Sequence, residues 1–389
     1  MAEPVRSVSM EERRARLGIR HGLAPGASFG GAIETARRLV GLHASDPTVP
    51  FLSVRARIKG FEPSQLEHEL YDTKSLTKHM AMRRTLFVFP HDTLALAHSA
   101  CSVAVARAQR KRLIKMIEDQ SIAADGAGWL TKAENDVLAE LSTHGPATGA
   151  QLSRSLPSIQ AKLRYGEGSK WIGQAAVSSR VFTQLALDGR IRRGRPKRWT
   201  SSQHRWELDT PPPPVHEAQA IVGLVNRWLH SFGPGTELDL KWWTGLGVTK
   251  IRAALKALDA VPVDLDGQIG FLLPDDLDPV SSPDSWVAFL PSLDPTGMGW
   301  KDRHWYLGVH EAELFDRNGN IGPTVWADGR IVGGWAQLPD RQIRFKLLED
   351  TSGELKEQAR AEAAALEAWF DGTVVKPRFP TPLDKRLRN

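Results

Sequence analysis

The sequence predicts a mixed α+β protein in which tandem winged-helix units precede a small antiparallel β-barrel. Three observations lead to this prediction. Residues 128–210 read as three helices followed by a hairpin with a basic tip, the order of elements in a winged helix. The same order returns after the proline run 211–214. From residue 286 onward, short β-rich segments alternate with glycine turns.

The composition is that of a soluble globular protein in a reducing compartment. The chain has 389 residues, enough for two or three domains, and contains one cysteine, Cys101, which excludes an internal disulfide and a multi-cysteine metal site. We find no apolar stretch long enough to cross a membrane, no secretory signal, no phosphate-binding loop and no paired-histidine metal motif. We therefore expect a cytoplasmic, nucleoid-associated protein without a cofactor or metal. The net charge of +6 permits nucleic-acid binding.

Residues 1–125 are predicted to form a first, mostly helical unit. Ser9 is a favourable N-cap for a helix that runs through Ile19. Asp46-Pro47 interrupts regular structure, and the paired arginines Arg83 and Arg84 precede a strand. Further helices are predicted over 28–42, 51–59 and 63–71, the strand over 85–89, and after it a long alanine-rich helix.

The second unit, residues 126–210, is expected to carry much of the DNA-binding surface. Helices are predicted over 131–141, 148–156 and 170–187, and the third is the one that would enter a major groove. A basic run without any acidic residue follows where the wing of such a domain contacts phosphates. Taken alone, this run would read as a solvated loop, but its position favours DNA contact. The expected contacts are Arg180 on the third helix and Arg190, Arg192, Arg193, Arg195, Lys197 and Arg198 in the wing.

Two further units complete the chain. Residues 211–280 repeat the pattern, with helices over 215–232, 237–244 and 249–258 and a hairpin over 261–271 that turns at Asp266-Gly267. Its wing is acidic, which favours a scaffolding role. Residues 281–389 are predicted to hold strands over 286–290, 305–309, 324–327, 330–335 and 343–345, then a helix over 353–370 and a basic tail. Asp294 precedes Pro295 in a turn, and Trp300 and Arg303 lie in a glycine-rich hairpin.

Four segments carry a resemblance to a known family: residues 39–47 (LVGLHASDP), 82–86 (MRRTL), 290–295 (LPSLDP) and 322–326 (GPTVW). Together they resemble the winged-helix DNA glycosylases of the AlkZ/YcaQ type over nearly the whole chain. The resemblance implies a C-shaped molecule of three winged-helix units and a C-terminal β-barrel, with double-stranded DNA on a basic concave face. It also implies excision of bulky or alkylated purines, crosslinked ones included. We expect a monomer.

The resemblance also assigns site residues, and here the chain departs from the family. The family's catalytic Gln-x-Gln or Gln-x-Asp falls on His43 and Ser45, with Asp46 beside them. A neutral histidine can accept a proton from water, Ser45 can hold that water, and Asp46 can orient His43 or stabilise a cationic sugar. In the alternative interpretation, Ser45 or Asp46 caps a helix and His43 merely packs.

The family places the remaining candidates near DNA. Arg83 and Arg84 precede a strand close to the duplex, and the hairpin with Asp294 approaches the minor groove. Trp300 is a candidate wedge in that groove, with Arg303 as a phosphate contact. Two functions follow from these features: a DNA N-glycosylase, or a non-catalytic DNA-binding protein that acts as a lesion binder or a transcriptional regulator. The replaced glutamines favour the second.

Overall fold

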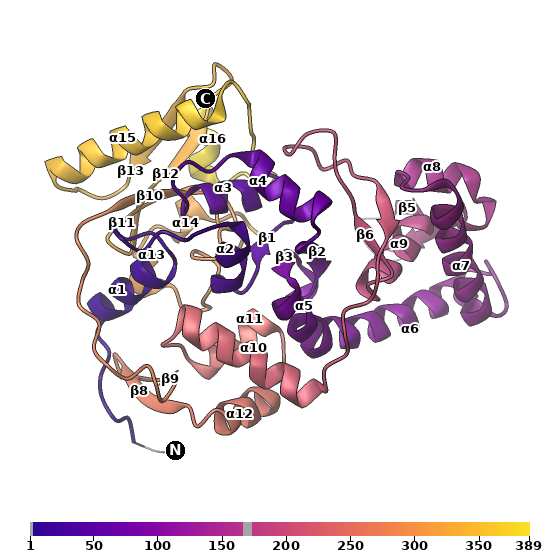
Figure 1. Cartoon of the computed structure of the whole chain (residues 1–389), viewed down its shortest axis with the longest axis horizontal. Helices are drawn as coiled ribbons and strands as arrows, with labels where there is room; N and C mark the ends of the chain where they lie inside the picture. Colours follow the sequence, from indigo (N-terminus) through magenta and orange to yellow (C-terminus); the bar gives the residue numbers. More distant parts are fainter. Residues whose placement is uncertain (1–2, 166–172) are drawn as a thin grey trace.

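The computed structural model describes residues 3–165 and 173–389, which form a main body and a smaller lobe joined by a long helix (Figure 1). The first region begins with α1 (Met10–Arg20), and the predicted cap is confirmed because Ser9 Oγ accepts from the Glu12 amide at 3.1 Å. Its other elements are α2 (Ala32–Arg38), β1 (Leu42–His43), α3 (Val49–Arg55), α4 (Pro63–Glu67), the π turn η1 (His68–Asp72), β2 (Leu76–Met80), the 3-10 turn η2 (Met82–Arg84), β3 (Leu86–Pro90), α5 (His91–Ala97), the π turn η3 (His98–Ser102) and α6 (Val103–Asp119).

The three strands of this region form an antiparallel sheet in the order β1-β3-β2. The sequence predicts a helix through Leu42, but α2 ends at Arg38 and the chain turns into β1. Gly41 makes that turn with a φ of 106°, and a Cβ built on it would lie 2.5 Å from the Phe89 ring. Only glycine fits this position, so the turn that brings His43 onto the sheet depends on it.

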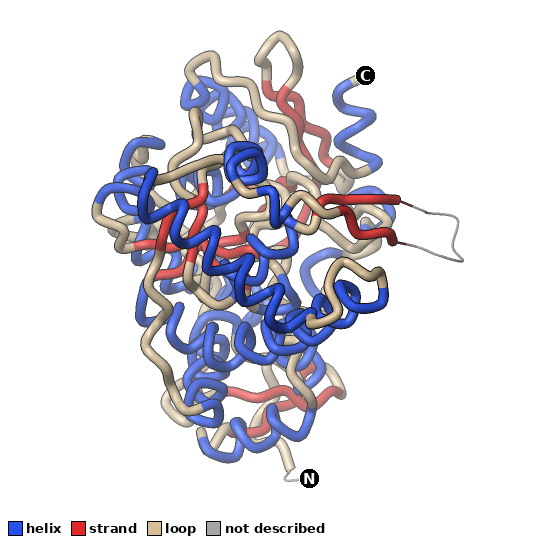
Figure 2. The backbone as a smooth tube through the Cα atoms, turned by 90° about the vertical axis from the view of Figure 1, so that its right-hand side faces the viewer, coloured by secondary structure: helices blue, strands red, loops and turns tan. Residues whose placement is uncertain are grey.

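The smaller lobe contains the second unit (Figure 1). Its elements are α7 (Gly126–His144), α8 (Gly149–Ser155), the 3-10 turn η4 (Pro157–Ile159), β4 (Lys162–Tyr165), β5 (Gly173–Ala176), α9 (Ser178–Leu187), β6 (Ile191–Arg193) and β7 (Trp206–Leu208). The predicted helix over 170–187 is wrong in its first part, of which residues 170–172 lie outside the described residues. Residues 173–176 pair with β4 instead, in a hairpin that projects from the body (Figure 2).

The third unit matches its prediction closely. It contains α10 (Glu217–Phe232), α11 (Glu237–Thr244), α12 (Val248–Ala257), β8 (Val261–Leu265) and β9 (Gln268–Leu272). Asp266 and Gly267 both have positive φ, 56° and 84°, as a two-residue turn between twisted strands requires. The Thr236 side chain caps α11 in a reciprocal arrangement with Asp239.

The C-terminal region forms a sheet rather than a closed barrel. Among the described residues it has the open antiparallel order β10 (Val287–Leu290), β11 (Thr324–Ala327), β12 (Arg330–Gln337) and β13 (Ile343–Leu347). Its helices are α13 (His304–Leu307), α14 (Glu311–Leu314), α15 (Gly353–Phe370) and α16 (Pro382–Arg388). The strand predicted over 305–309 is wrong, because residues 304–307 form the helical turn α13, in which the Leu307 amide donates to the Arg303 carbonyl at 2.8 Å.

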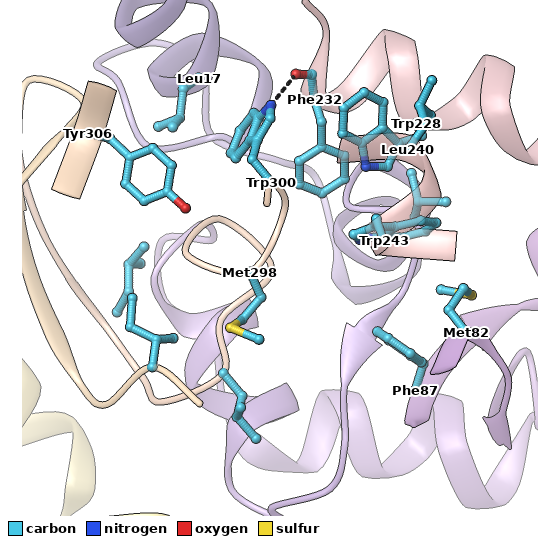
Figure 3. Close-up of a cluster of buried hydrophobic side chains, with 14 of the residues drawn as sticks. Leu17, Met82, Phe87, Trp228, Phe232, Leu240, Trp243, Met298, Trp300 and Tyr306 are labelled. Atoms are coloured by element: carbon cyan, nitrogen blue, oxygen red, sulfur yellow. Dashed lines mark hydrogen bonds between the residues drawn. The ribbon is translucent and has the colours of Figure 1, made fainter. Parts of the chain in front are cut away.

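One large apolar core joins the first, third and C-terminal regions. An aromatic group at its centre includes Phe232 of α10 with Trp300 and Tyr306 (Figure 3). Trp300 is 2% exposed, and its indole N–H donates to the Phe232 carbonyl at 3.1 Å. The lobe has a core of its own, built from α7 and α9 and from Leu113 and Ile117 of α6.

Candidate active site and nucleic-acid interface

The β1-β3-β2 sheet separates the predicted site residues onto two faces. His43 pairs with Phe87, and Phe87 pairs with His79, so these three side chains form a row on one face. Lys78 pairs with Val88, which places it on the opposite face. The row lies against the main core, which includes Phe87. The opposite face lies over a second cluster, which includes Val88.

His43 is a buried polar side chain whose hydrogen-bonding groups have no partner. It is 6% exposed and packs against the Phe87 ring at 4.7 Å between centroids. Within the described part of the chain, neither of its ring nitrogens makes a hydrogen bond. Burial and, to a smaller extent, the nearby Arg83 lower the pKa of His43 to about 3, while Asp294 opposes the shift. The ring is therefore neutral at physiological pH, with one N–H donor and one nitrogen lone pair that the described residues leave unsatisfied.

Ser45 and Asp46 have separate roles. Asp46 is 2% exposed; its Oδ1 accepts from the Thr48 amide at 2.9 Å and from the Thr48 hydroxyl at 2.7 Å. Its Oδ2 accepts from the Arg378 amide at 2.8 Å. Both carboxylate oxygens are thus engaged in fixing the start of α3 and a C-terminal segment. This corrects the prediction that Asp46 orients His43. Asp46 is not a helix cap either, because the N-cap of α3 is Thr48 and no side-chain cap hydrogen bond is present there. Ser45 is half-buried, and its carbonyl accepts from the Arg378 guanidinium at 3.1 Å.

Two predicted arginines lie around one indole ring, and one of them, Arg83, is close enough to His43 to lower its pKa. The Arg83 guanidinium is 3.9 Å from the centre of the Trp242 ring, and that of Arg303 is 4.9 Å from it. Burial and the neighbouring Arg303 lower the pKa of Arg83 to about 10. In residues 3–165 and 173–389, neither guanidinium is ion-paired with a carboxylate. Such a pair of uncompensated cations is suited to a phosphate. Arg84 is exposed on the same turn.

Arg83 and Arg84 both have positive φ, 51° and 62°. This left-handed backbone is costly for side chains other than glycine, and tertiary contacts must hold it in place. One such contact is Gly245 at the end of α11, because a Cβ built there would lie 3.2 Å from Arg83 Cγ. The third unit therefore fixes the direction in which Arg83 points.

Asp294 and Trp300 do not face DNA, which corrects two predictions. Asp294 is 1% exposed and forms a two-pronged ion pair with Arg57, whose nitrogens lie 2.7 and 3.0 Å from the two carboxylate oxygens. Its oxygens also accept from the Ser53 hydroxyl at 2.6 Å and from the Thr296 amide at 2.9 Å. Trp300 lies in the aromatic core (Figure 3). Neither residue can reach a groove without unfolding the centre of the molecule.

Some cations of the basic wing form ion pairs within the protein, whereas others are exposed to solvent. Arg192 is 6% exposed and pairs with Glu207 at 2.7 Å, so it supports the hairpin rather than a phosphate. Arg195 pairs with Asp72 at 2.7 Å and anchors the wing on the first region. Arg193 is half-buried, whereas Lys197 and Arg198 are exposed.

The third helix of the lobe is less accessible than predicted. Along α9 the side chains of Val181, Phe182, Gln184 and Leu185 are buried. Arg180 is half-buried and faces α6 across a shallow pocket, which Gln109 and Arg112 also line. Arg190 is half-buried at the end of α9. These surroundings leave little of α9 free to enter a groove.

Sequence reasoning missed four residues around this site. Arg57 balances Asp294, and Arg378 joins the C-terminal segment to Ser45. The buried His79 and His98 lie 3.1 Å apart between ring nitrogens, and burial lowers the pKa of His79 to about 3. The partners of these four residues lie 19 to 333 residues away along the chain. No local motif therefore marks any of the four in the sequence.

Comparisons with known proteins identify the family of this chain. A family model described as DNA glycosylase AlkZ-like matches residues 36–369. The chain belongs to the AlkZ-like DNA glycosylase family. This confirms the resemblance inferred from the four segments. The interstrand DNA cross-link repair glycosylase of Streptomyces sahachiroi is 25% identical over 155 residues, which cover 38% of this AlkZ-like chain and 42% of that protein. The matched part is therefore about two fifths of the curated relative.

The fold is shared over a longer range than the sequence. The solved structure of Streptomyces sahachiroi DNA glycosylase AlkZ aligns with a TM-score of 0.70 at 19% identity, covering 95% of this chain and 99% of that one. Over the described residues, no cluster of histidine, cysteine, aspartate or glutamate side chains is arranged to hold a metal ion. None of the helices described is both long and apolar enough to cross a membrane.

Proposed function

We propose that this protein is a DNA N-glycosylase that removes alkylated or bulky purines from duplex DNA. The observation that carries the proposal is His43, a buried, neutral histidine with two unpartnered ring nitrogens at the family's catalytic position. A buried polar group without a partner costs about 1–3 kcal/mol of folding free energy, so its retention calls for a ligand that satisfies it. Water held against a nucleotide sugar is such a ligand.

The chemistry matches this residue. A purine alkylated at N7 carries a positive charge, so the glycosidic bond breaks with its electron pair passing to the base. The sugar becomes oxocarbenium-like, and a water oxygen bonds to the anomeric carbon while its proton leaves. With a pKa of about 3, His43 is a weak base, and its role is to position that water through the lone pair. Ser45 lines the pocket on the opposite face of the sheet together with Lys78, so His43 alone positions the water in this proposal.

The cations near His43 supply the DNA-binding part of the proposal. Arg83 and Arg303 hold a phosphate of the damaged strand beside Trp242, and Arg84, Lys197 and Arg198 contact the backbone further along. We propose three winged-helix units that curve around the duplex with these residues on the inner face. The curated relative is named for the repair of interstrand cross-links, and we extend bulky adducts of that kind to this chain.

The test is release of free base from duplex DNA that contains N7-methylguanine or a bulkier N7 adduct. Wild-type protein is compared with His43→Ala, Ser45→Ala and the exposed control Arg360→Ala on α15. We expect His43→Ala to lose about tenfold or more in single-turnover rate, and Ser45→Ala and the control to match wild type. No release from any adduct, with salt-dependent binding retained, would exclude the glycosylase. Release by His43→Ala at the wild-type rate would exclude our assignment of the site.

The second function, a non-catalytic lesion binder or regulator, is favoured by one observation. Both carboxylate oxygens of Asp46 are hydrogen-bonded to Thr48 and Arg378, so this carboxylate is not free to activate water beside Ser45. The same assay separates the two functions, since a lesion binder retains the alkylated duplex and releases no base.

A further inference from the structure

A cationic pocket lies on the face of the β1-β3-β2 sheet that is opposite His43. It encloses about 360 Å³ of space between protein atoms and the adjoining solvent. Three separate parts of the chain meet there: the first region with Ser45 and Lys78, the wing with Arg193 and His204, and the C-terminal segment with Arg378. Among the described residues that line it, none is an aspartate or a glutamate.

The cations in this pocket repel one another, and Glu67 offsets that repulsion only in part. Lys78 donates to the Tyr71 hydroxyl at 2.8 Å; burial and Arg193 lower its pKa to about 8, and Glu67 opposes the shift. The Arg193 guanidinium lies 5.8 Å from the centre of the Trp206 ring, and burial and the neighbouring Arg378 lower its pKa. Holding three cations together with no acid in the lining costs free energy, which a bound anion would recover.

A second group in the pocket also lacks a partner. The His204 Nδ1 is 3.1 Å from the Ser202 carbonyl, which makes this nitrogen the donor and leaves Nε2 as an acceptor when the ring is neutral. His204 Nε2 is buried and has no hydrogen-bond partner within residues 3–165 and 173–389. Burial, Arg193 and Lys78 lower the pKa of His204 to about 4. A phosphate oxygen would reverse that effect, so that His204 binds the anion as a donor.

We propose that this pocket binds one phosphate group of the DNA backbone. The proposal rests on the proposed function for the identity of the polyanion. The exposed Lys197 and Arg198 lie on the same wing and extend the positive surface from the pocket. A phosphate bound here would also hold the wing against the main body.

The test measures the salt dependence of binding to a lesion-free duplex, so it does not depend on base excision. The variants are Arg193→Gln, Arg378→Gln and their double variant. The control is Lys356→Gln with Arg360→Gln, which removes the same charge from α15. One phosphate contact contributes about 0.9 to the slope of log K against log salt. Because both arginines serve the same phosphate, we expect the double variant to lose about 0.9 in slope and each single variant to lose part of it.

Raising the salt from 50 to 200 mM should therefore weaken DNA binding by the double variant about 3.5-fold less than it weakens binding by wild type. A double variant with the wild-type slope would overturn the proposal, and so would a loss of about 1.8, which would indicate two independent surface contacts. Inorganic phosphate tests the other source of the same chemistry. Stabilisation of wild type by phosphate together with an unchanged DNA slope would assign the pocket to a free anion and overturn the DNA assignment. Failure of base release with the expected slopes would reject the glycosylase and leave this phosphate contact standing.

Discussion

The ion pair between Arg57 and Asp294 offers a sharp test of how the site is built. Replacing Asp294 with asparagine removes the negative charge and places an NH₂ group where the protein supplies only hydrogen-bond donors. The carboxylate accepts four hydrogen bonds, two from Arg57 and one each from Ser53 and Thr296. Arg57 is 1% exposed and would keep a buried charge without a counterion. Breaking one partner of such a pair costs about 3–5 kcal/mol of unfolding free energy.

Urea unfolding followed by tryptophan fluorescence measures this cost, because Trp228 and Trp300 lie in the main core (Figure 3). The control is Glu357→Gln, which breaks an exposed pair with Arg360 and should cost under about 0.5 kcal/mol. The Arg57→Met, Asp294→Leu double variant should recover most of the loss, since it removes both charges. If Asp294→Asn lowers the unfolding free energy by less than about 1 kcal/mol, the view that it leaves the Arg57 charge buried and uncompensated is refuted. Wild-type stability of Asp294 variants combined with weaker DNA binding would restore its predicted role at the groove.

Two other predictions follow from the wing and the buried histidines. Replacing Arg193, Arg195 and Lys197 together should weaken DNA binding for all sequences. The slope of log K against log salt should fall by about 0.9 for each phosphate that the wing no longer neutralises, and an unchanged slope would show that the wing does not contact the DNA backbone. Burial lowers the pKa of His21, His43 and His79 to about 3, so the unfolded state takes up more protons as pH falls below about 6.5 and stability decreases. From pH 7.5 to 5.5 the expected loss is about 1.4 kcal/mol for each histidine, measured by urea unfolding, and His79→Gln should lose correspondingly less. Equal stability of wild type at the two pH values would contradict these shifts.

The sequence by itself determined the order of units and the identity of the family. Periodicity and capping residues located α1, α8, α10 and α11, and Asp266-Gly267 located the turn of the third unit, because these signals act within a few residues. The domain boundaries at 125, 210 and 280 stay predictions. Local signals failed at residues 173–176, where pairing with β4 overrode an alanine-containing helical pattern, and at 305–307, which belong to the short helix α13.

The tertiary structure alone decided which polar residues are free to act. From the sequence, Asp46, Asp294 and Arg192 had the same standing as His43, Arg83 and Arg303. In the structure the first three have partners that lie 2, 237 and 15 residues away along the chain. The second three have no carboxylate partner among the described residues. The physical reason is that a charge or a hydrogen-bonding group is available for chemistry only when the fold has not already satisfied it. That depends on contacts across the whole chain, which no local pattern records.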